Sequence, residues 1–158
     1  MLFVAHVQAD MRAALSSLYE QEAGQLLRVA FAILRDAHEA EEVVHDAFAA
    51  MSPRLGAIDN PAAYLRVSVI NGARRVLRRR VVRRRTCIPR DAGVELPERL
   101  AEFGDLLGAL TDRRRTVVVL RYVCDLPDAD IAATLGCTEG SVRSLARRAL
   151  MQLRKELE

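Results

Sequence analysis

Residues 128–150, DADIAATLGCTEGSVRSLARRAL, decide the fold class of this chain. Their spacing fits a helix-turn-helix, in which two helices cross at a tight turn. Such a motif needs a small residue at the crossing, a permissive one at the turn and apolar residues facing inward. These needs are met by Ala132, Gly136, Val142 and Leu145. Thr138 can cap the second helix through its hydroxyl, and Pro127 suits the first turn of the preceding helix.

The second helix of this motif has hydrogen-bond donors on its predicted outer face. They are Ser141, Arg143, Ser144, Arg147 and Arg148. Side chains of these types contact phosphates and base edges in a DNA groove. The spacing alone also occurs in helical proteins that bind no DNA, so it is the outer face that favours DNA binding.

Composition favours helices elsewhere as well. The length of 158 residues suits one ordinary domain or two small ones. The residues are 51% hydrophobic and 4% aromatic, and there is no tryptophan. Abundant Ala, Leu, Val and Arg without strand-like alternation predict an all-α fold. No segment reaches about 18 uncharged apolar residues, and the amino terminus has no secretory pattern. We therefore expect a cytoplasmic protein without membrane insertion.

The three cysteines, Cys87, Cys124 and Cys137, form no C-x-x-C pair and are odd in number. We interpret them as reduced thiols rather than as a disulfide framework. Cys124 and Cys137 are expected to be small buried residues of the carboxy-terminal half, whereas Cys87 falls in a predicted linker. Redox sensing is the less favoured alternative.

Charge is strongly partitioned along the chain, although the formal net charge is only +3. Residues 1–59 hold four arginines against nine acidic residues, residues 60–90 hold ten arginines and no acid, and residues 91–158 hold ten basic against twelve acidic residues. This asymmetry indicates an acidic surface for a protein partner and a basic helix for a polyanion.

Apolar periodicity predicts one or two helices over residues 10–35. A capping box at Asp36 and Glu39 starts another, which ends near Ser52, and Asn60-Pro61 starts a third. The apolar residues expected to face inward from the helix that starts at Asp36 are Ala40, Val43, Val44, Ala47, Phe48 and Met51. Residues 86–98, TCIPRDAGVELPE, have no clear period. We therefore predict two small helical domains, 1–85 and 99–158, joined by a flexible linker at 86–98. The second should contain about four helices, with breaks near 110–112, 125–127 and 135–137.

The end of the third predicted helix is crowded with arginines and has no acidic residue nearby. They are Arg74, Arg75, Arg78, Arg79, Arg80, Arg83, Arg84 and Arg85. A bound polyanion would relieve their mutual repulsion, and each neutralised phosphate would steepen the log–log salt dependence of binding by about 0.9. A solvated helix end, where cations favour the negative end of the helix dipole, accounts for only one or two of them.

The second predicted helix has an acidic outer face, which contains Glu41, Glu42, His45 and Asp46. Glu42 and His45 form one Glu-x-x-His pair of the kind found in di-iron bundles, but that site needs a second pair and two further glutamates. We therefore favour a solvated or partner-binding face and expect no metal and no cofactor. The sequence also has no Ser or Cys nucleophile with a recognisable His partner, so we expect that the protein is not an enzyme.

The amino-terminal half resembles region 2 of the extracytoplasmic-function sigma factors of bacterial RNA polymerase. Residues 40–48, AEEVVHDAF, are similar to the family segment A-E-D-hydrophobic-hydrophobic-Q-E-x-F, which binds the core polymerase. Residues 60–71 and the arginine run resemble the helix that engages the −10 promoter element. The resemblance implies core-polymerase contacts at Glu41, Glu42, His45 and Asp46. It implies DNA contacts at Arg66, Asn71, Arg74, Arg75 and Arg78.

The carboxy-terminal half resembles region 4 of the same family. Residues 110–122, LTDRRRTVVVLRY, are similar to L-P-x-x-x-R-x-V-x-x-L-R-Y, and residues 140–144, GSVRS, to the G-T-V-K-S that starts the helix reading the −35 element. Residues 145–150 look closer to an actinobacterial branch. The resemblance implies a promoter-recognition factor for RNA polymerase. Because anti-sigma control is common in that family, an anti-sigma factor is also among the partners considered.

Three positions depart from the family pattern. Met51 stands where a Trp is common, His45 stands where Gln is usual, and the loop over residues 55–60 is short, which bears on −10 selectivity and melting. Two alternatives stay open from the sequence. One is a stand-alone helix-turn-helix regulator, and the other is a sigma-like adaptor without promoter activity.

Overall fold

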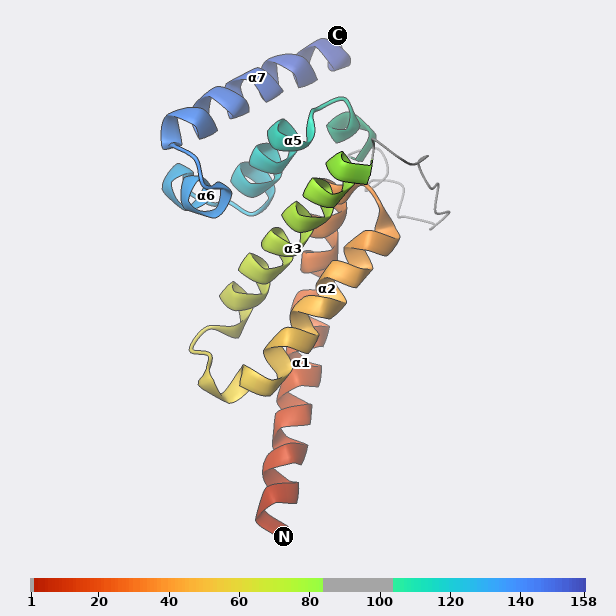
Figure 1. The fold of residues 1–158 in the computed structure, drawn as a ribbon, viewed down its shortest axis with the longest axis vertical. Helices are drawn as coiled ribbons and strands as arrows, with labels where there is room; N and C mark the ends of the chain where they lie inside the picture. Colours follow the sequence, from red (N-terminus) through yellow and green to blue (C-terminus); the bar gives the residue numbers. More distant parts are fainter. Residues whose placement is uncertain (1, 84–103) are drawn as a thin grey trace.

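The structure is a computed structural model that describes residues 2–83 and 104–158, and it contains no strand within those ranges (Figure 1). Residues 104–108 are helical. The other helices are α1 (Leu2–Leu34), α2 (Ala37–Met51), the 3₁₀ helix η1 (Ser52–Ala57), α3 (Pro61–Arg83), α5 (Asp112–Val118), the π-helical turn η2 (Val119–Val123), α6 (Asp128–Leu135) and α7 (Glu139–Leu157). The all-α prediction is confirmed.

Local signals explain how α1 ends and how α2 and α3 begin. Arg35, with φ of 56°, ends α1, and the Asp36 side chain accepts the Glu39 N–H at 2.9 Å at the start of α2. The Asn60 side chain accepts the Ala63 N–H at 3.0 Å at the start of α3. Only half of the predicted capping box forms, because the Glu39 carboxylate pairs with Arg80 instead of reaching back. The first helix also starts earlier than expected.

The amino-terminal core lies between α1, α2 and α3. All six apolar residues predicted to face inward from α2 are buried: Ala40, Val43, Val44, Ala47, Phe48 and Met51. On α3, Leu65, Val69 and Ile70 are buried. Val67, an apolar residue of the same helix, is 50% exposed.

The helix-turn-helix forms as the sequence predicts. Gly136 adopts the left-handed conformation, with φ of 62°, at the end of α6, a conformation that favours glycine. Thr138 caps α7 by accepting the Ser141 N–H at 3.1 Å. Pro127 stands one residue before α6 rather than in its first turn. Cys124 and Cys137 are half-buried, where burial was predicted.

The two halves share their hydrophobic packing, which the sequence did not predict. α3 packs against α1 and α2 on one side, and on the other side it faces α5 and α6 (Figure 1). Ile70 of α3 belongs to the core of the helix-turn-helix half, while Leu107, Val118 and Ala149 belong to the core of the amino-terminal half. The predicted linker, 86–98, lies outside the described residues, so the domain bounds stay a prediction. None of the described helices is long and apolar enough to span a membrane.

Candidate nucleic-acid interface

The outer face of α7 presents the predicted donors. Ser141, Arg143, Arg147 and Arg148 are exposed and Ser144 is half-buried. The opposite face is buried through Val142, Ala146 and Ala149 at helical spacing. Arg143 has only a loose contact with Glu139, at 3.5 Å. Because packing fixes the helix and leaves this face uncovered, its guanidinium groups are available to an anionic partner.

The predicted donors of α3 divide into two groups. Asn71, Arg75 and Arg78 are exposed, whereas Arg66 and Arg74 are half-buried. Two members of the arginine run bond to the protein itself, contrary to the idea that a polyanion accounts for the whole run. Arg80 donates to the Leu34 carbonyl oxygen at 2.8 Å and pairs with Glu39, and Arg74 contacts α6. The side chains of Arg83, Arg84 and Arg85 lie outside the described part of the chain.

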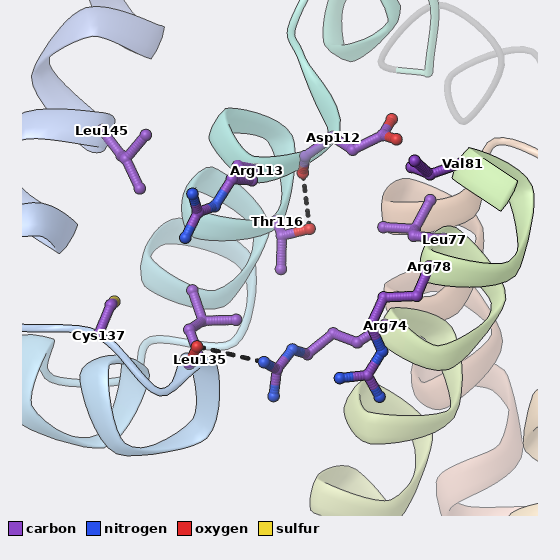
Figure 2. A pocket seen from close by; sticks show the side chains of 10 residues that line it. All are labelled: Arg74, Leu77, Arg78, Val81, Asp112, Arg113, Thr116, Leu135, Cys137 and Leu145. Carbon is purple, nitrogen blue, oxygen red and sulfur yellow. Dashed lines mark hydrogen bonds between the residues drawn. The ribbon is translucent and has the colours of Figure 1, made fainter.

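Arg74 caps the carboxyl end of α6. Its guanidinium donates to the carbonyl oxygen of Thr134. It also donates, at 3.2 Å, to the carbonyl oxygen of Leu135, a bond that Figure 2 shows. These carbonyls lack partners within the helix and lie at the negative end of its dipole. Burial, and next the neighbouring charge of Arg78, lower the pKa of Arg74. The contact borders a groove of about 260 Å³ between α3 and the helix-turn-helix half, which Leu77, Arg113, Cys137 and Leu145 also line.

The outer face of α2 is exposed and acidic. Glu41, Glu42, His45 and Asp46 all face solvent, as predicted. His38 Nε2 lies 3.7 Å from a Glu42 carboxylate oxygen. The described residues include no group of three His, Cys, Asp or Glu side chains that could hold a metal ion. This face offers negative charge without a metal-binding arrangement.

Arg115 is a positioning residue that the sequence analysis missed. It is 6% exposed and donates to the carbonyl oxygens of Ile33 at 2.9 Å and Leu110 at 3.3 Å, and to Asp112 at 2.5 Å. It thereby joins the end of α1 to α5. Burial lowers its pKa, and the charge of Asp112 opposes that shift. The helical period, which places Arg115 beside Val118 and Val119, was the available signal.

The structure places the three departures from the family pattern. Met51 is fully buried in the amino-terminal core, so its side chain has no exposed surface for DNA. His45 is exposed on the acidic face of α2. The short loop after α2 is partly the 3₁₀ helix over residues 52–57, and the exposed Asp59 follows it. The change at Met51 therefore acts on packing.

Comparisons with known proteins identify the family. The model of Sigma-70 region 2 matches residues 18–83, and that of Sigma-70 region 4 matches residues 100–153. The RNA polymerase sigma-E factor of Streptomyces coelicolor is 32% identical over 140 residues, which cover 84% of this chain and 79% of that protein. The chain belongs to the sigma-70 family, as an extracytoplasmic-function sigma factor.

Further relatives match shorter parts of this sigma factor. The sigma factor SigF of Mycobacterium tuberculosis is 37% identical over 68 residues, which cover 43% of this chain and 26% of that protein.

Two solved structures share the fold. RpoE of Bartonella quintana, crystallised with the anti-sigma factor NepR, has a TM-score of 0.69 at 21% identity over 89% of this chain and 96% of its own. CnrH, in complex with the cytosolic domain of CnrY, has a TM-score of 0.63 at 24% identity over 92% and 88%.

Proposed function

We propose that this sigma factor divides its work among three helices. The acidic face of α2 binds core polymerase through Glu41, Glu42, His45 and Asp46. The basic face of α3 contacts the −10 element through Arg66, Asn71, Arg74, Arg75 and Arg78. The outer face of α7 reads the −35 element through Ser141, Arg143, Ser144, Arg147 and Arg148. The proposal places the sigma factor in the cytoplasm, as an initiation factor and not an enzyme.

The observation that carries this proposal is the separation of exposed charge. The α2 face is acidic and the α7 face is basic, and each lies opposite a buried apolar face. An acidic face repels DNA but complements a basic protein surface, whereas α7 offers bidentate donors of the kind that read base edges. Opposite charges on separate helices therefore support separate protein and DNA partners.

The mechanism follows from joining two weak DNA-binding units. Each half alone offers few phosphate contacts, so its affinity for DNA should be low and sensitive to salt. When core polymerase fixes both halves, engagement of one promoter element raises the effective concentration of the other half at its own element. Promoter selection is therefore expected to need the complete complex.

Paired variants test the division of labour. We expect Arg147→Ala and Arg143→Ala to weaken promoter binding by the assembled holoenzyme by about 1 to 3 kcal/mol each, with core affinity unchanged. Glu42→Lys should weaken core binding and leave α7 intact. Matched controls are Arg154→Ala, on the exposed end of α7, and Glu20→Lys, on the exposed side of α1. Equal loss of both activities in every variant would contradict the proposal.

The same assays separate the alternatives. A stand-alone helix-turn-helix regulator would bind specific DNA without polymerase, because dimers of such regulators hold two half-sites by themselves. An adaptor would bind core polymerase but would not crosslink to promoter DNA. This sigma factor, by contrast, is expected to bind core polymerase, to crosslink to promoter DNA in the complex and to show no specific DNA binding without polymerase.

An anti-sigma factor is a further proposed partner. RpoE of Bartonella quintana, which shares the fold, was crystallised with one. We expect such a protein, if added to purified sigma factor before core polymerase, to block holoenzyme assembly. Gel filtration of the three components checks this expectation, and co-elution of the candidate inhibitor with intact holoenzyme would contradict it.

A further inference from the structure

Apolar and basic side chains meet in the groove between α3 and the helix-turn-helix half, which has a volume of about 260 Å³. Leu77 and Val81 line it from α3, and Leu135, Cys137 and Leu145 line it from the opposite side (Figure 2). Apart from the thiol of Cys137, these side chains are hydrocarbon. A phosphate group needs no such walls, so the groove suits a ligand that also buries apolar surface.

Positive charge gathers at the same groove. Arg74, Arg78 and Arg113 line it, and Figure 2 shows Arg74 and Arg78 extending from α3 into the space between the two halves. Burial, and next the charge of Arg78, lower the pKa of Arg74, and the charge of Arg113 adds a smaller effect of the same sign. Three like charges therefore lie near one another, and a bound anion would relieve their repulsion.

The groove has little negative charge of its own. Asp112 is the single acidic residue among the described residues that line it, and its carboxylate already accepts from Arg115 at 2.5 Å. In the described part of the chain neither Arg78 nor Arg113 forms a salt bridge, and both are exposed. Arg74 is engaged by the carbonyls of α6. Arg78 and Arg113 are thus the groups that can receive an anion from solvent.

The volume of the groove limits the size of its ligand. An apolar cavity of about 150 Å³ holds one benzene ring, which has six carbons. By that proportion, a groove of about 260 Å³ holds roughly ten carbons. A carboxylate is an anionic group that an arginine binds through two parallel hydrogen bonds. Size, apolar walls and charge together describe a small amphipathic acid.

We infer that this groove binds an amphipathic carboxylate of roughly ten carbons, a medium-chain fatty acid in chemical class. Its carboxylate pairs with Arg78 under the added charge of Arg113, and its hydrocarbon chain lies between Leu77 and Leu145. Binding itself does not depend on the proposed function. One consequence does rest on it: because that function assigns Arg78 to the −10 element, the bound acid would compete with promoter DNA.

Isothermal titration calorimetry of the full chain with decanoate, kept below its micelle-forming concentration, measures binding. We expect one saturable site with a dissociation constant in the micromolar range, as a ligand of this size can provide. Decanol has the same chain without the charge, and acetate has the charge without the chain. Each should bind at least about tenfold more weakly, because each lacks one of the two interactions.

Matched variants locate the ligand. Val81→Asp places a negative charge on an exposed wall of the groove and should weaken decanoate binding at least about tenfold. Val67→Asp is its control, because Val67 is half-exposed on the same helix and is not a lining residue. Arg78→Ala should weaken binding by a similar factor. Arg79→Ala, the exposed neighbour that does not line the groove, should leave it nearly unchanged.

Cys137 reports the position of the ligand independently. Its half-buried thiol lines the groove, whereas Cys124 is not among the lining residues. Saturating decanoate should slow maleimide labelling of Cys137 severalfold and leave the labelling rate of Cys124 unchanged. Peptide mass spectrometry measures the two rates separately.

Each outcome bears on the inference. Absence of saturable decanoate binding would overturn it, as would equal affinities for decanoate and decanol. Equal affinities of Arg78→Ala and Arg79→Ala for decanoate, or unprotected Cys137, would show that the acid binds elsewhere and would also overturn it. If circular dichroism shows that Val81→Asp has unfolded, the Arg78→Ala and Arg79→Ala pair decides.

Transcription separates this inference from the proposed function, because the binding assays need neither DNA nor polymerase. Decanoate should lower promoter-specific run-off transcription by the wild-type holoenzyme, and it should lower transcription by the Val81→Asp holoenzyme less, each relative to its own rate without the acid. Decanoate that protects Cys137 and leaves wild-type transcription unchanged would contradict the assignment of Arg78 to the −10 element and leave the binding site standing.

Discussion

The packed sides of α3 and α5 and the outer face of α7 all contain arginines, but they use them in different ways. Arg74, Arg80 and Arg115 bond to backbone carbonyls at helix ends, and Arg115 is almost fully buried. Arg147 and Arg148 on α7 are exposed. The comparison teaches that, among these residues, an arginine bonds within the protein where helix-end carbonyls lie within reach and faces solvent where none does.

The largest expected effect is on the most buried arginine. Arg115→Ala should lower the free energy of unfolding by about 3 to 5 kcal/mol, because it leaves two carbonyls and the Asp112 carboxylate without their partner. Arg113→Ala, an exposed neighbour on α5, should cost within about 0.5 kcal/mol. Urea unfolding measures both. A loss below about 1 kcal/mol for Arg115→Ala would break the comparison.

Adjacent residues in the arginine run give a closer test. Arg80→Ala should cost about 1 to 3 kcal/mol, since its charged hydrogen bonds to Leu34 and Glu39 are lost in a half-buried site. Arg79→Ala, whose side chain is exposed, should leave stability nearly unchanged. Thermal and urea unfolding should rank the two variants alike. Equal stabilities would show that contacts to helix ends do not distinguish the two arginines.

The smallest expected effect concerns the side-chain cap at the start of α7. Thr138→Ala should cost about 1 kcal/mol, because its hydroxyl caps the first turn of α7. Thr111→Ala, at the start of α5, should cost only a few tenths of that amount, because the Thr111 side chain makes no capping bond. Chemical denaturation of both variants measures the difference, and a larger cost for Thr111→Ala would contradict the assignment of the caps.

Local sequence signals predicted much of the fold. The apolar period of α2 identified its buried face. Asp36 and Thr138 marked helix starts, because each side chain accepts an N–H three residues further along, and Gly136 marked a helix end through its left-handed conformation. The exposed faces of α2 and α7 followed from the same periods. Their roles in binding polymerase and DNA stay predictions.

What the sequence could not supply was contact between residues far apart along the chain. Val67 and Ile70 are both apolar residues of α3, but only Ile70 meets the helix-turn-helix core. The carbonyl partners of Arg74 lie 60 and 61 residues away, and the Ile33 partner of Arg115 lies 82 residues away. A backbone carbonyl has no sequence signature, so the bonding partners of these arginines could not be predicted, although the helical period indicated the buried position of Arg115.

The most direct test of the account is run-off transcription with purified core RNA polymerase, this sigma factor and genomic fragments from its source organism. A gel shift of the same fragments without polymerase is run alongside it. We predict initiation at discrete sites only when both proteins are present, with no specific shift by the sigma factor alone. Tight, specific DNA binding without polymerase, and no initiation with it, would contradict the account and favour the stand-alone regulator.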